Sequence, residues 1–129
     1  IAPNYAYYLP RTEHGSSLSA CMYALNACKL GLADQAYPLF MKSARADLED
    51  GGKQWAGLVY IGGTHPAAAG GAYMTLLWGF LGMSLQADAL RFSPRLPSHW
   101  QSVTARFSRN GKRYEVNATQ TGVTCREMV

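Results

Sequence analysis

Two stretches of this chain contain no charged residue, and an amphipathic stretch lies between them. Residues 17–28 and 66–81 contain no Lys, Arg, Asp or Glu. A helix that is apolar or small on every side is buried on every side. The middle stretch places apolar residues on one helical face and charged residues on the other. The pattern predicts three helices, in the order inner, outer, inner, at residues 17–30, 34–48 and 66–81.

Alternating inner and outer helices are typical of an α/α barrel. The inner helices of such a barrel run parallel, so their N-termini open at the same end. Three helices cannot close a barrel, and we therefore expect these to be the last helices of a larger one. Residues 1–15 lack periodicity and contain Pro3 and Pro10, so we expect them to be irregular.

The period changes after Gly82, where alternating apolar and polar residues predict strands. Asn110-Gly111 is a strong signal for a two-residue hairpin turn. The predicted strands cover residues 89–93, 103–108, 113–119 and 122–127. The fold class is therefore mainly α with a β tail. We expect two domains, the barrel portion at residues 1–83 and an antiparallel sheet at residues 84–129.

Composition and charge exclude several classes of protein. The formal net charge is +4, but the basic residues are scattered rather than clustered, which argues against a nucleic-acid binder. The longest apolar run, residues 67–83, is interrupted by glycines and predicts a buried helix rather than a membrane span. Cys21, Cys28 and Cys125 have no metal-ligand spacing, so we expect no metal, and reduced thiols suggest a cytoplasmic protein.

Similar polar clusters precede both inner helices. Each cluster combines glycine, hydroxyl and histidine at a helix N-terminus, where unpaired N–H groups and a partial positive charge favour anions. Because both clusters are expected at one end of the barrel, they predict a pocket for an oxyanion such as phosphate. The residues expected to bind phosphate are His14, Gly15, Ser16, Ser17, Thr64 and His65.

Simpler roles remain open for several of these residues. Ser16 and Ser17 could act only as N-caps, and His14 could brace its loop instead of binding an anion. Asp47 stands with other acids near the end of the second helix, and we interpret this cluster as solvated. Trp55 and Tyr60 lie in a long loop and could stack on a sugar ring or simply pack.

In these motifs the chain resembles glycoside hydrolase family 65, the disaccharide phosphorylases typified by the maltose, kojibiose, nigerose and trehalose enzymes. The matching stretches are residues 7–19, 47–48, 60–68, 78–82 and 90–100. The resemblance implies a large N-terminal β domain, an α/α six-hairpin barrel and a small C-terminal sheet. This chain would correspond to the last part of the barrel and to the sheet.

The resemblance also implies a reaction, in which inorganic phosphate cleaves an α-glucosidic bond with inversion and gives β-glucose 1-phosphate. Phosphate would be a co-substrate rather than a cofactor, held by Ser16, Ser17 and His65. The family's general-acid glutamate belongs to a barrel segment upstream of Tyr5, so this segment alone should be inactive. The implied partners are a disaccharide, phosphate and the remainder of the enzyme, with a homodimer left open.

Two other functions are compatible with the same motifs. A hydrolase of the same family, such as a trehalase, would use water in place of phosphate. A non-catalytic module would bind a sugar or an anion without cleaving it. Inverting hydrolysis needs a second carboxylate to activate water, whereas phosphate is already a nucleophile.

Overall fold

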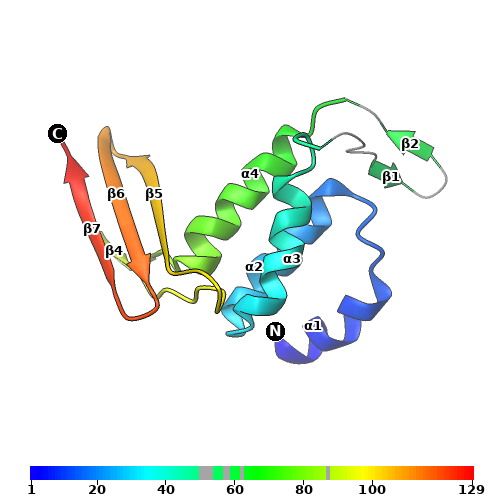
Figure 1. Cartoon of the computed structure of the whole chain (residues 1–129), viewed down its shortest axis with the longest axis horizontal. Helices are drawn as coiled ribbons and strands as arrows, with labels where there is room; N and C mark the ends of the chain where they lie inside the picture. The colour runs from blue at the N-terminus through cyan, green and yellow to red at the C-terminus, as the bar shows by residue number, and fades with distance from the viewer. Residues whose placement is uncertain (50–53, 57–58, 62, 87) are drawn as a thin grey trace.

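The computed structural model describes residues 1–49, 54–56, 59–61, 63–86 and 88–129. A layer of helices packs against a three-stranded sheet at one end of the molecule (Figure 1). The helical elements are α1 (Ala2–Tyr8), the 3₁₀ turn η1 (Leu9–Arg11), α2 (Ser17–Lys29), α3 (Ala33–Ala44), α4 (Pro66–Met74) and the π-helical turn η2 (Thr75–Phe80). The strands are β1 (Gln54–Ala56), β2 (Val59–Ile61), β3 (Ser84–Gln86), β4 (Ala89–Arg91), β5 (Ser102–Arg109), β6 (Lys112–Thr119) and β7 (Val123–Met128).

The two charge-free helices are confirmed as α2 and as α4 continued by η2. The expectation of irregular structure in residues 1–15 is wrong, because α1 and η1 fill most of it. Pro3 lies in the first turn of α1 and Pro10 in η1, positions where a missing N–H costs little. The outer helix, α3, ends at Ala44 instead of continuing to residue 48.

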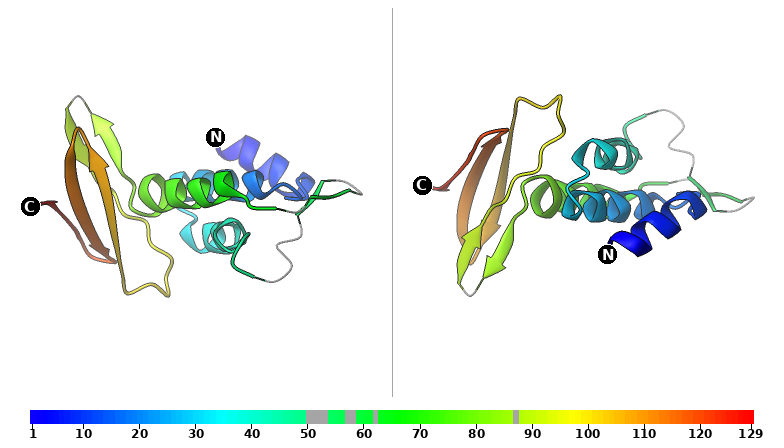
Figure 2. Two further views of the ribbon diagram at one scale, coloured as in Figure 1. Left: turned by 90° about the horizontal axis from the view of Figure 1, so that it is seen from above. Right: turned by 90° about the horizontal axis from the view of Figure 1, so that it is seen from below.

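Helices α2 and α4 run side by side in the same direction (Figures 1 and 2). The contact is close because small residues meet along it. The Thr75 hydroxyl donates to the carbonyl oxygen of Cys21 at 3.0 Å. A Cβ on Gly79 would lie 3.1 Å from the Cys28 sulfur. The parallel seam places the starts of both helices at the end of the molecule away from the three-stranded sheet (Figure 1).

Aromatic packing joins the helices to the sheet at the opposite end. The Phe80 ring lies 5.3 Å from that of Phe40 and 5.0 Å from that of Trp100, which precedes β5. Arg95 donates to the carbonyl oxygens of Cys28 and Lys29 at 2.9 and 2.8 Å, and so caps the C-terminus of α2. These contacts hold the C-terminal ends of the helices against the sheet. The helix starts lie at the opposite end of the molecule (Figure 1).

The β tail follows the predicted pattern. Strands β5, β6 and β7 form one antiparallel sheet in chain order, and β3 pairs with β4 in a short hairpin. Asn110 and Gly111 both have positive φ, 50° and 75°, as the predicted hairpin turn requires. Strand β3 and the hairpin β1–β2 were not predicted, because three-residue strands are too short to show alternation. Along the described residues, no helix is long and apolar enough to cross a membrane.

Candidate functional site

The C-terminal end of α3 connects the starts of α2 and α4. Ser43, in the last turn of α3 and only 2% exposed, donates through its hydroxyl to the carbonyl oxygen of Ser17 at 3.1 Å. Just beyond the helix, Asp47 accepts hydrogen bonds from His65. The two helix starts that carry the predicted anion-binding residues are therefore tied to one segment of chain.

The start of α2 is capped by its own side chain. Ser16 is the N-cap, and its hydroxyl oxygen accepts from the backbone N–H of Leu18 at 3.3 Å. This is the geometry of an ordinary N-cap, and Ser16 is exposed. Ser17 is half-buried beside it, with its carbonyl oxygen bound by Ser43. Both hydroxyls stay predicted phosphate contacts, and Ser16 also performs the simpler role.

His14 is enclosed just before this helix start. Its Nδ1 lies 3.0 Å from the Ser19 hydroxyl, and its ring meets Tyr23 edge-on with centroids 4.8 Å apart. Nε2 is buried and has no hydrogen-bond partner among the residues the structure describes. Burial, and then the nearby charge of Lys42, lower the pKa of His14. The ring packs the loop against α2, and a phosphate contact from His14 stays a prediction.

His65 is the N-cap residue of α4 and is held by Asp47 at two points. Its backbone N–H donates to Oδ2 of Asp47 at 2.6 Å, and its Nδ1 lies 2.6 Å from Oδ1. The hydrogen bond from the backbone N–H, followed by that from the ring, lowers the pKa of Asp47. Asp47 is exposed, as expected, but it also binds His65. The neighbouring Thr64 is exposed.

The aromatic residues predicted to stack on a sugar belong to the hairpin β1–β2. Trp55 and Tyr60 are register partners in that hairpin. The hairpin lies at the same end of the molecule as the two helix starts (Figure 1). Their side chains are outside the described part of the structure, so sugar stacking stays a prediction.

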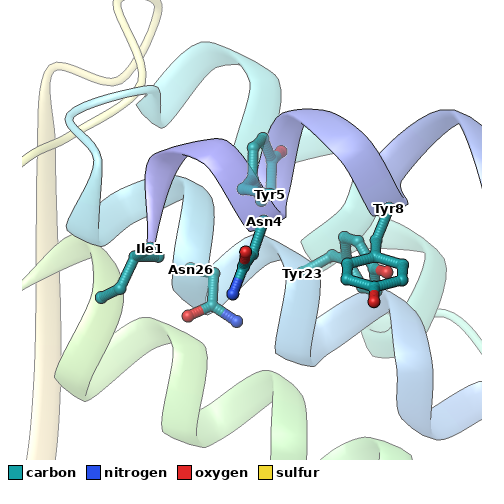
Figure 3. Close-up of a pocket in the computed structure, with 6 residues that line it drawn as sticks. All are labelled: Ile1, Asn4, Tyr5, Tyr8, Tyr23 and Asn26. Atoms are coloured by element: carbon teal, nitrogen blue, oxygen red, sulfur yellow. The ribbon is translucent and has the colours of Figure 1, made fainter.

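A cavity of about 350 Å³ lies between α1 and α2. Its lining residues are Ile1, Asn4, Tyr5, Tyr8, Tyr23 and Asn26 (Figure 3). Asn4 and Asn26 point toward each other across it (Figure 3). It reaches the later turns of α2 rather than its start, and it is separate from the predicted anion-binding residues. Within the described ranges, no three His, Cys, Asp or Glu side chains are grouped as metal ligands.

A parallel pair of charge-free helices, joined to a small antiparallel sheet and starting in histidine and hydroxyl clusters, is what the resemblance to the disaccharide phosphorylases implied. The chain belongs to glycosyl hydrolase family 65. Residues 1–74 match the family's central catalytic domain, and residues 83–127 match its C-terminal domain.

Relatives of this chain include two phosphorylases. It is 55% identical over 120 residues to a nigerose phosphorylase of Lachnoclostridium phytofermentans, which covers 93% of this chain and 16% of that protein. It is 38% identical over 121 residues to a 1,2-alpha-glucosylglycerol phosphorylase of Bacillus selenitireducens, covering 94% of this chain and 16% of that protein. The chain therefore spans about a sixth of the length of these relatives.

A solved structure shares the fold. It is named "Putative kojibiose phosphorylase from human microbiome" and superposes with a TM-score of 0.78 at 27% sequence identity. The match covers 96% of this chain and 18% of that one. The helices and the sheet thus have a counterpart of the same arrangement within a larger protein.

Proposed function

We propose that this chain is the C-terminal part of an inverting disaccharide phosphorylase, which cleaves an α-glucosidic bond with inorganic phosphate to give β-glucose 1-phosphate. Membership of family 65 and the phosphorylase relatives support this function. The observation that supports the phosphate site is a pair of hydrogen bonds at the end of α3. Ser43 binds Ser17 at the start of α2, and Asp47 binds His65 at the start of α4. These two bonds tie the helix starts to one segment.

In this proposal, phosphate binds at the paired helix starts. Ser16, Ser17 and His65 donate to it, and the backbones of Gly15 and Thr64 lie alongside. Millimolar affinity requires only about −4 kcal/mol. Hydrogen bonds to a charged group contribute about 1.5–3 kcal/mol each, so a few such donors and the partial positive charges of two helix N-termini are sufficient.

The chemistry follows from the nucleophile. An inverting hydrolase needs one carboxyl group as acid and a second as base to activate water. Phosphate attacks without such a base, provided that it is held in line with the anomeric carbon. The general-acid glutamate is expected in a barrel segment outside these residues, and this segment supplies the phosphate site.

In this proposal, the remainder of the barrel packs against an apolar groove on the surface of this chain. The groove, about 390 Å³, lies between α4 with η2, the hairpin β3–β4 and strand β5. Tyr73, Trp78 and Leu85 line it and are 43%, 45% and 60% exposed. In this proposal residues 1–83 complete the barrel and residues 84–129 form the C-terminal domain. Free cysteines favour a cytoplasmic enzyme.

The test uses the full-length protein that carries this segment, with α-linked glucose disaccharides as substrates. We expect cleavage to require phosphate and to release glucose 1-phosphate. His65→Ala should raise the KM for phosphate about 10- to 100-fold, the loss of one charged hydrogen bond, and should leave the KM for the disaccharide nearly unchanged. The exposed His99 supplies a control in His99→Ala, which should behave as the wild type.

Three results would contradict the proposal. Cleavage that proceeds equally fast without phosphate, giving free glucose, would identify a hydrolase of the trehalase kind. An unchanged KM for phosphate in His65→Ala would remove His65 from the phosphate site. Sugar binding without any cleavage would favour a non-catalytic module.

A further inference from the structure

We propose that Asp47 is a positioning residue that orients the His65 ring toward phosphate. The inference rests on the proposed function, because it assigns how one phosphate ligand is held. Asp47 itself need not touch the substrate, since both of its carboxylate oxygens are already bound to His65.

The two contacts from Asp47 restrain His65 more than either would alone. Oδ2 accepts from the backbone N–H of His65 and Oδ1 accepts from its ring, each at 2.6 Å. A ring bound at one nitrogen and anchored through its own backbone has little freedom to rotate about its side-chain bonds. The His65 side chain is also only 12% exposed, so packing adds to the restraint.

The pair also fixes which ring nitrogen is available. A carboxylate can only accept hydrogen bonds, so Nδ1 of His65 carries the hydrogen. Nε2 is then the remaining polar atom of the ring, the one that Asp47 does not hold. In the neutral ring Nε2 accepts from a P–OH group, and in the protonated ring it donates to a P–O⁻ oxygen.

Charge balance supports the same role. An unpaired carboxylate near the start of α4 would repel phosphate and offset the partial positive charge of the helix N-terminus. When His65 is protonated, the Asp47–His65 pair is neutral and the helix start stays favourable to an anion. Among the described residues beside Asp47, Arg45 and Glu49 pair with each other at 3.3 Å and so balance in charge.

The position of Asp47 is itself fixed by α3. Ser43 lies one turn earlier and anchors the end of α3 to Ser17 on α2. Backbone hydrogen bonds from Ala46 to Ser43 and from Leu48 to Arg45 then shape the turn that presents Asp47. A shift in this turn would move His65 relative to Ser16 and Ser17.

The test compares four variants of the full-length enzyme: Asp47→Asn, His65→Ala, the double variant and Asp34→Asn. Asp34 is the matched control, because like Asp47 it is an exposed aspartate that accepts a backbone N–H, that of Ser98 at 2.7 Å, but it lies in α3 at the sheet end. We expect Asp47→Asn to raise the KM for phosphate about 10-fold, because misplaced contacts of this kind cost up to about 100-fold. The disaccharide KM should stay unchanged, and Asp34→Asn should keep the phosphate KM of the wild type.

The double variant separates positioning from independent action. If Asp47 acts through His65, Asp47→Asn should add no further loss to His65→Ala. Additive losses would overturn the inference, and so would a wild-type phosphate KM in Asp47→Asn when His65→Ala is impaired; in both cases the phosphate site itself would stand. An unimpaired His65→Ala would instead remove His65 from the proposed phosphate site and overturn this inference, whereas cleavage that does not require phosphate would overturn the proposed function.

A purely structural role of Asp47 would give a different result. Asp47→Glu retains the carboxylate and should recover part of the phosphate KM lost in Asp47→Asn. If both variants melt at the same lower temperature and neither recovers phosphate binding, Asp47 only stabilises the turn and the inference is wrong.

Discussion

The starts of α2 and α4 have similar sequences but different chemistry. Before α2, His14 is enclosed against Tyr23, and Ser16 caps the helix with its own hydroxyl. At α4, His65 is itself the N-cap residue, and its partner Asp47 comes from another element. The first histidine is bound at Nδ1 by a hydroxyl of the helix that it precedes, whereas the second is bound at Nδ1 by a carboxylate from a different segment. A shared pattern of Gly, hydroxyl and His therefore does not define a shared role.

The largest predicted loss of stability comes from a substitution that forces α2 and α4 apart, because their contact places both helix starts side by side. A Cβ on Gly71 of α4 would overlap the sulfur of Cys21 on α2, whereas the adjacent Gly70 faces open space. We expect Gly71→Val to lower the free energy of unfolding by about 2–3 kcal/mol, the usual cost of overpacking. Thermal or urea unfolding followed by circular dichroism measures it.

Gly70→Val is the control for this change. It introduces the same β-branched residue one position earlier in the same helix, where no atom lies within 4 Å of the added Cβ. Its unfolding free energy should stay within about 0.5 kcal/mol of the wild type. Equal losses in both variants would show that the close approach of Gly71 to Cys21 does not determine the result, since Val has a higher helix propensity than Gly.

The parts of the fold that sequence predicts are those set by local pattern. The charge-free stretches identify α2 and α4, and Asn110-Gly111 places the β5–β6 turn. Helix α1 is missed because Pro3 is treated as a breaker although it lies in the first turn. Trp78 lies in the second charge-free stretch, which the pattern predicts to be buried on every side, but it is 45% exposed and lines the apolar groove.

The site is predicted less completely, for a physical reason. The candidate residues at each helix start are neighbours in sequence, so their composition is visible. The Asp47–His65 contact joins residues 18 positions apart. Asp47 follows α3 and His65 begins α4, and the strands β1 and β2 lie between them in sequence. No periodic pattern encodes such a contact, and only the packing of α3 against α4 brings it about.

A smaller difference in unfolding free energy should appear between substitutions of Ser16 and Thr64, the hydroxyl residues at the two helix starts. Ser16 makes a side-chain capping bond, whereas the side chain of His65, the N-cap residue of α4, makes none, and Thr64 is exposed. We expect Ser16→Ala to lower the unfolding free energy by about 1 kcal/mol, and Thr64→Ala to change it by less than about 0.5 kcal/mol. Urea denaturation of both variants measures the difference, and equal values would mean that the capping bond contributes nothing.

The smallest predicted effect is the contribution of His14, before α2, to the pH dependence of stability. Burial lowers the pKa of His14 below its usual value of 6.5, so the unfolded chain takes up its proton before the folded chain does. Stability is therefore unaffected by this group above pH 6.5 and falls as pH decreases through and below that value. Asn tolerates the positive φ of His14, 53°, and does not titrate, so His14→Asn should flatten this part of the profile.

His99→Asn provides the comparison for this profile. His99 also meets a tyrosine edge-on, Tyr37 at 4.5 Å, but it is exposed. Its removal should leave the decline below pH 6.5 in place, measured as melting temperature between pH 5 and 8. A decline that persists in His14→Asn and disappears in His99→Asn would assign the titration to the sheet end of the molecule. His14 would then not cause the decline in stability, and its enclosure would not make the start of α2 more sensitive to pH than the start of α4.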